Sequence, residues 1–151
     1  MKLAEALLLR ADLQKKLASL KARIDRNIQV QENETPDENS QELMIDAQQV
    51  NDQLHDLIAK IHRTNAHTMI GNHTLMTVLV ERDKLVERHK IVMSALNAAR
   101  RNNDRYSNRE IKWVVTIPVK ALQKQADDIS EKIRTINNTI QANNWQIELM
   151  E

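Results

Sequence analysis

Apolar residues in the second quarter of the chain alternate at steps of four and three residues. The pattern runs through Leu43, Ala47, Val50, Leu54, Leu57 and Ile61. This spacing places the apolar side chains on one face of an α-helix and is typical of a coiled-coil seam. The same spacing recurs near the end of the chain, at Leu122, Ala126, Ile129, Ile133, Ile136 and Ile140. The sequence therefore predicts long helices that pack along their length.

Four helical segments can be read from the apolar spacing along the chain. We expect helices over about 3–30, 38–64, 75–101 and 118–144. At 1.5 Å per residue, each would be roughly 40–45 Å long, which suits a slender antiparallel bundle with short connections. The length of 151 residues corresponds to one domain. The sequence thus predicts a single all-α domain over 1–151, arranged as a four-helix bundle or coiled coil.

Composition excludes most other folds. The chain has one glycine, two prolines and no phenylalanine, and aromatic residues make up only 2% of it. Sandwiches, barrels and doubly wound sheets need many turns and strands rich in β-branched or aromatic residues. A single glycine also cannot build a glycine-rich phosphate-binding loop. The absence of cysteine excludes disulfides, thiol catalysis and thiolate metal sites.

One segment has the character of a β-strand. Residues 111–117 are largely β-branched and roughly alternate in polarity. They could pair with residues 65–70 as a short β-ribbon. Between these segments, Gly71 and Asn72 can turn the chain tightly, and Thr74 is expected to cap the helix that starts at Leu75.

Charge and hydropathy favour neither a nucleic-acid nor a membrane partner. The formal net charge is +1, so no long-range field recruits nucleic acid or acidic lipid. No stretch approaches the roughly 18–20 apolar residues of a membrane span. The apolar run at the amino terminus is too short for the core of a signal peptide. The cytoplasm is therefore the expected location, with non-classical secretion left open.

The third predicted helix carries polar residues on its apolar face. Its two apolar stripes both pass through Arg82 and His89, which are seven residues apart. One interpretation is a polar layer that fixes helix register, in which Arg82 pairs with an acidic residue of a neighbouring helix or subunit. The other is a ligand site, with Arg82 holding an anion and His89 carrying a proton or binding a metal. The candidate residues are Arg82, Asp83 and His89, and the flanking apolar residues favour the polar layer.

Two weaker candidates lie elsewhere. Asp52 and His55 have a spacing that suits a metal ion, but the second pair that a di-metal bundle needs is not found, so we expect no cofactor. Basic residues gather with a tyrosine near the third connection and could contact phosphates and a base. These residues are Arg101, Arg105, Tyr106 and Arg109. Asp104 and Glu110 interrupt the cluster, so no nucleic-acid partner is expected.

Several short strings, taken in their order and spacing, resemble a small bacterial family of helical proteins. They are Ile61-His62-Arg63-Thr64-Asn65, Glu81-Arg82-Asp83, Arg105-Tyr106-Ser107 and Asn144-Trp145. The family is of unknown function, and its members often carry the name septicolysin. The resemblance covers nearly the whole chain and implies a helical, oligomer-forming protein. The name implies a pore-forming haemolysin, and the resemblance implies no catalytic residues.

We expect a self-assembling helical protein with a structural or interaction role and no catalytic activity. Its partner would be itself, as a dimer or a larger homo-oligomer. The apolar start of the first helix and the apolar run at 113–117 exceed what four thin helices can cover, and such patches usually mark interfaces. One alternative is a pore-forming cytolysin, for which binding to a membrane surface would be needed. The other is a ligand or metal binder that uses Arg82 and His89.

Overall fold

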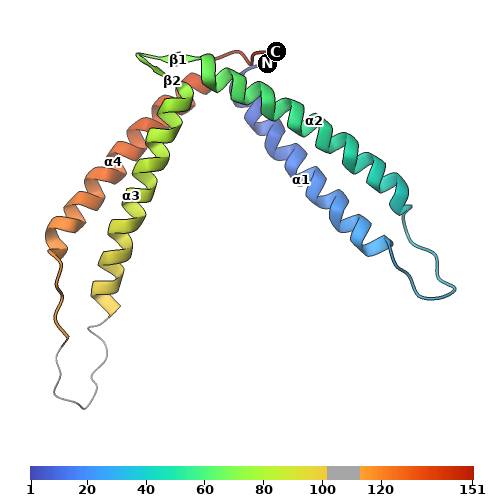
Figure 1. The fold of residues 1–151 in the computed structure, drawn as a ribbon, viewed down its shortest axis with the longest axis horizontal. Coiled ribbons are helices and arrows are strands. Elements are labelled where there is room, and N and C mark those ends of the chain that lie inside the picture. Colours follow the sequence, from blue (N-terminus) through green and yellow to red (C-terminus); the bar gives the residue numbers. More distant parts are fainter. Residues whose placement is uncertain (102–112) are drawn as a thin grey trace. The chain divides into compact units, whose positions relative to one another are not determined.

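The structure is a computed structural model that describes residues 1–101 and 113–151. Its four long helices are α1 (Leu3–Asn27), α2 (Ser40–His67), α3 (Leu75–Arg101) and α4 (Val119–Asn144) (Figure 1). The prediction of an all-α protein with four long helices is therefore confirmed. The expected boundaries agree with the observed ones to within about three residues, which is the accuracy that helix-end signals allow.

The described residues cluster into two compact units, each built on a pair of helices. The first unit comprises Met1–Met69 together with Asn143–Glu151, and the second comprises Ile70–Ala142. Chain length alone predicts one domain, whereas each of these units has its own cluster of buried apolar residues.

In the first unit, α1 and α2 pack side by side as an antiparallel hairpin (Figure 1). The predicted seam of α2 faces α1, because a 4-3 spacing keeps one stripe of the helix against its neighbour. The buried cluster consists of Leu20, Leu43, Ala47 and Val50, flanked by Leu13, Leu17 and Ile24. On the α2 side, the cluster therefore consists of residues from the predicted 4-3 spacing.

Side chains from both helix ends fix the connection between α1 and α2. Arg23 Nε donates to Glu38 Oε2 at 2.9 Å, and the guanidinium also binds the second oxygen of this carboxylate. Asn27 Oδ1 accepts the Glu38 backbone N–H at 3.0 Å. Asn39 caps α2 by accepting the backbone N–H groups two and three residues further on. The connection is thus positioned by polar contacts and needs no glycine.

The two ends of the chain pair with each other in the first unit. Residues 1 and 3 exchange backbone hydrogen bonds with residues 149 and 147, each 2.9 Å long, around an antiparallel bridge between Lys2 and Glu148. The Glu148 carboxylate accepts from Lys2 Nζ at 2.6 Å and from the Met1 ammonium at 3.2 Å. We call residues 1–3 and 146–150 the terminal clasp. Both cations lower the pKa of Glu148, because they hydrogen-bond to its ionised form.

A buried threonine ties the terminal clasp to α2. Thr64 is 0% exposed, and its Oγ1 donates to the Lys60 carbonyl at 2.8 Å. The same oxygen accepts the backbone N–H of Met150 at 2.9 Å. A buried hydroxyl is costly unless it is hydrogen-bonded, and this one both donates and accepts. The end of the chain is therefore anchored in the interior of the first unit as well as by surface charges.

The short strands differ from the expected ribbon. Strand β1 (Met69–Ile70) pairs with β2 (His73–Thr74) around Gly71, whose φ of +60° lies in the left-handed region that favours glycine. Residues 113–117 form no strand, and residues 111 and 112 lie outside the described part of the chain. The predicted ribbon between residues 65–70 and 111–117 is therefore wrong for the described residues, because β1 pairs with β2 instead. A tight turn closes a smaller loop at a lower entropy cost, so the local pairing is favoured.

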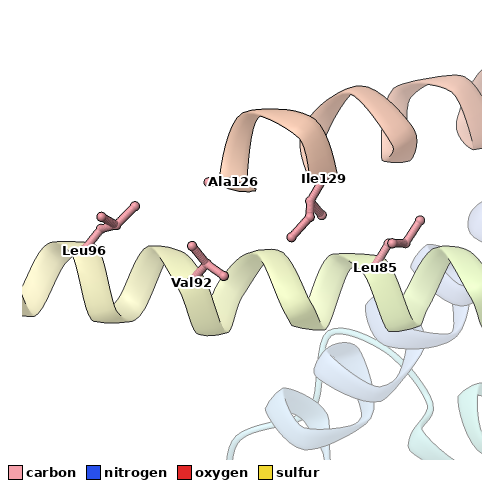
Figure 2. Packing of buried hydrophobic residues seen from close by; sticks show 5 residues of the cluster. All are labelled: Leu85, Val92, Leu96, Ala126 and Ile129. Carbon is pink, nitrogen blue, oxygen red and sulfur yellow. The ribbon is translucent and has the colours of Figure 1, made fainter. Parts of the chain in front are cut away.

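In the second unit, apolar side chains of α3 and α4 face each other. Figure 2 shows Leu85, Val92 and Leu96 of α3 directed toward α4, with Ala126 and Ile129 of α4 opposite. Four partly buried residues pack against this cluster, namely Met93, Leu122, Ile133 and Ile136. As expected, Thr74 caps α3, with its Oγ1 accepting the Thr77 backbone N–H at 3.2 Å.

Within residues 1–101 and 113–151, none of the helices combines the length with the continuous apolar character that a membrane crossing requires.

We predict that Leu20→Ala destabilises the first unit by about 2–5 kcal/mol, the usual cost of truncating a buried leucine. Leu20 is 4% exposed and lies in the cluster between α1 and α2. Leu8 belongs to the same helix but is 60% exposed, so Leu8→Ala should change the free energy of unfolding by less than about 0.5 kcal/mol. Urea unfolding followed by circular dichroism measures both variants, and equal losses would contradict this core.

We predict that Glu148→Gln lowers the melting temperature at pH 7. The folded-state pKa of Glu148 is lowered, so its stabilising effect is present above the ordinary glutamate value of about 4.3 and is lost as pH falls through the folded pKa. The difference from the parent protein should therefore shrink as the pH is lowered below 4. Glu32→Gln, at an exposed loop position, is the control and should show little difference at either pH. A deficit for Glu148→Gln that is independent of pH would contradict the ionic part of the clasp.

Candidate functional site

The polar residues of α3 lie in the second unit, and Arg82 finds its partner in its own helix. Arg82 Nε and Nη2 lie 3.0 and 2.7 Å from Asp83 Oδ1. The Arg82 side chain is 32% exposed. A long arginine side chain can lie along the edge of an apolar seam while its charged end reaches toward water. Within the single chain, Arg82 thus contacts the next residue and not an acidic residue of another helix, while pairing with a second subunit stays a prediction.

His89 makes the contact across helices that a polar layer needs. Its Nε2 lies 3.0 Å from Ser130 Oγ, so α3 and α4 are joined beside the apolar cluster. The half-buried ring is thereby oriented by a residue of the other helix. Arg82 and Asp83 bind each other and not His89, so the three candidate residues do not converge on one point. This arrangement suits the fixing of helix register better than the binding of a small anion.

Within the described residues, the proposed metal residues Asp52 and His55 do not belong to a larger group of possible metal ligands. The His55 ring nitrogen Nδ1 lies 2.8 Å from the Asn51 carbonyl oxygen and donates to it, which leaves one ring nitrogen for another contact. Asp52 is exposed on the same helix of the first unit. Over residues 1–101 and 113–151, no group of three or more histidine, aspartate or glutamate side chains is placed to hold a metal ion.

Most of the predicted basic cluster near the third connection lies outside the described residues. Arg105, Tyr106 and Arg109 lie outside the described residues, and the side chain of Arg101 is not described either. In the neighbouring described part, Arg100 donates to Gln123 Oε1 of α4 at 3.3 Å.

A groove that the sequence does not predict runs along one side of the α3–α4 hairpin. Two adjoining hollows share Leu85, Arg88, Asp128 and Lys132 among their lining residues. Ile129 and Ile136 add apolar surface, while Glu81 and Glu131 add charge. Arg82 and His89 do not line these hollows. Charged residues beside a seam look in sequence like an ordinary solvated helix face, so they gave no signal for the groove.

A third hollow lies near the carboxyl end of α3. Three alanines of α3, at positions 95, 98 and 99, form one wall, and the extended residues 113–117 form the other. Trp113 and Val114 are 74% and 79% exposed, the highest values among the large apolar side chains of the described residues. Alanine side chains leave room beside the helix, so this part of the hairpin offers an apolar surface open to a partner.

The outward face of α3 also exposes apolar side chains among charges. Val80 and Ile91 are each 63% exposed. Around them, Lys84 Nζ binds Glu81 at 2.6 Å and lowers the pKa of that carboxyl through this hydrogen bond, while Lys90 Nζ binds Glu87 at 3.3 Å.

We predict that Arg82→Met changes the free energy of unfolding by less than about 1 kcal/mol, because the exposed contact with Asp83 contributes little. Ser130→Ala should cost about 0.5–1.5 kcal/mol, because it removes the hydrogen bond between α4 and His89. Chemical unfolding of both variants measures the two losses in the free energy of unfolding. A loss for Arg82→Met several times larger than that for Ser130→Ala would contradict this prediction and indicate a buried ion pair at Arg82.

Comparison with known proteins gives a family and a solved relative but no activity. A search of curated proteins found no match to this chain. A solved structure described as "Crystal structure of a functionally unknown conserved protein from Corynebacterium diphtheriae" is similar, at 32% sequence identity and a TM-score of 0.94, with 99% of each chain covered. Residues 10–149 match the family described as "Family of unknown function (DUF6847)". Because this match covers most of the chain, the protein belongs to that family of unknown function.

Proposed function

We propose that this protein is a self-assembling helical protein with a structural or interaction role, and that it catalyses no reaction. The observation that carries the proposal is the exposure of Trp113 and Val114, at 74% and 79%. Exposed apolar surface of this kind marks contacts between proteins, and tryptophan is enriched among residues that dominate binding energy.

The surroundings of these two residues support a protein partner. Val115 is 41% exposed, and the three residues lie beside the alanine wall of α3. Val80 and Ile91 are further exposed apolar side chains of α3. Together they give the second unit apolar surface in excess of what one pair of helices covers.

The polar contacts of α3 support a structural role. Arg82 binds Asp83, and His89 binds Ser130, so these side chains already have partners inside the protein. A general base or a nucleophile needs a free reacting atom directed toward substrate. Of the two contacts, the one between His89 and Ser130 joins the two helices of the second unit.

We predict a homo-oligomer at micromolar concentration in sedimentation velocity, with a mass that is a multiple of 17.5 kDa. Trp113→Ala should shift the distribution toward the single chain, because it removes the most prominent apolar contact. Trp145→Ala is the matched control: this tryptophan is 56% exposed but belongs to the first unit, and its loss should leave the distribution unchanged.

A single 17.5 kDa species for the parent protein would overturn the proposal. Release of dye from liposomes separates self-assembly from the pore-forming activity that the septicolysin name implies. We expect no release at concentrations at which the oligomer is present. Release that depends on protein concentration would favour a cytolysin instead.

A further inference from the structure

A second set of positions at heptad spacing lies on the outward face of α3 and holds Val80 and Ile91 among polar residues. Its positions follow an unbroken 3-4-3-4-3-4 spacing, and every one of them is exposed: Thr77, Val80, Lys84, Glu87, Ile91, Ser94 and Ala98. The inward seam, with Leu85, Val92 and Leu96, is already covered by α4. A helix with seams on two faces can pack against a second neighbour while the first stays in place.

The six positions from 77 to 94 show the same order of residue types in both chain directions, except that the two central residues carry opposite charges. Small hydroxyl residues, Thr77 and Ser94, stand at the two ends. Aliphatic residues, Val80 and Ile91, follow inward, and opposite charges, Lys84 and Glu87, stand at the centre. Each pair lies at equal distances on either side of the midpoint between residues 85 and 86. A second copy of this helix, laid antiparallel, would therefore place each residue beside its complement.

We propose that the outward seam of α3 is a two-fold contact with the α3 of a second copy, in antiparallel orientation, with the axis between residues 85 and 86. This inference rests on the self-assembly proposed above and adds to the surface around Trp113 a second contact, together with the partner that forms it. In this register Val80 packs on the partner's Ile91, and Lys84 pairs with the partner's Glu87. Each contact occurs twice, as in any interface between identical copies related by a two-fold axis.

Charges beside the seam support the same orientation. Glu81 and Arg88 border it on one side, and Asp83 and Lys90 border it on the other; all four are exposed. In antiparallel coiled coils, bordering positions on the same side meet across the contact, so Glu81 faces the partner's Arg88 and Asp83 faces the partner's Lys90. A parallel arrangement would instead bring Lys84 to the partner's Lys84, and like charges across an interface disfavour that orientation.

The ion pairs already present are compatible with this contact. Lys84 Nζ binds Glu81 at 2.6 Å, and Lys90 Nζ binds Glu87 at 3.3 Å. An ammonium group has three donors, so Lys84 can keep Glu81 while it reaches the partner's Glu87. Val80 and Ile91, each 63% exposed in the single chain, would be removed from water together. The reversed order of the seam is what makes a second copy, and not an unrelated helix, its fitting partner.

Charge reversal tests the contact. Lys84→Glu places a carboxylate against the partner's Glu87 at two symmetric points, so the dissociation constant should rise by about tenfold or more in sedimentation velocity. Adding Glu87→Lys restores opposite charges in reversed order and should recover assembly to within about threefold of the parent. Lys120→Glu, at an exposed position of α4, is the control and should leave assembly unchanged. Circular dichroism checks that each variant stays helical.

The outcomes separate the two proposals. If the parent protein is an oligomer and Lys84→Glu assembles like the Lys120→Glu control, the seam is not the contact, although self-assembly stands. If the parent protein is a single chain, the proposed function fails first. A double variant that stays as weak as Lys84→Glu would overturn the direct pairing of residues 84 and 87.

Introduced cysteines test the register, since the chain has none of its own. Val80→Cys mixed with Ile91→Cys should form a disulfide-linked dimer under mild oxidation, because the two positions face each other across the axis. In either variant alone, the two thiols are offset by the rise of 11 residues, about 16 Å, beyond the reach of a disulfide. Efficient linking in a single variant, with none in the mixture, would overturn the antiparallel register.

Discussion

Burial of one apolar stripe per helix is the constraint on which the rest of this structure depends. A helix of about 25 residues gains most of its stability in a protein from packing of such a stripe. In the first unit this burial involves Leu20, Leu43 and Val50, and in the second it involves Leu85 and Ile129. A pair of helices has only one inner face to cover. The outward side chains of each unit therefore stay available for other contacts, and in the second unit these include large apolar residues.

Local signals explain why so much of the fold can be predicted from the sequence. The 4-3 spacing around Leu54, the turn at Gly71 and the cap at Thr74 each act within a few residues, and all three appear in the structure. The terminal clasp could not be predicted in this way. The bridge between Lys2 and Glu148 joins residues that are far apart in sequence, and no periodic pattern marks it.

The candidate site was harder to predict, because a helix position specifies a face but not a partner. The seven-residue spacing of Arg82 and His89 predicted that both lie beside the apolar seam, and His89 does meet Ser130 of α4 there. Arg82 has a long side chain with several donors, so its partner depends on rotamer and on water access. Asp83 satisfies it from the same helix. The groove along α3 was missed for a related reason, since its charged rim resembles any solvated surface.

The terminal clasp has a consequence for the order in which a nascent chain can fold. Domains usually fold from the amino terminus as they leave the ribosome. Here the first unit includes Asn143–Glu151, whereas the second unit lies entirely within Ile70–Ala142. The α1–α2 hairpin can form early, but Thr64 lacks the backbone donor of Met150 until residues 143–151 have been synthesised. The first unit is thus completed only after all residues of the second unit have been synthesised, although most of its own residues precede them.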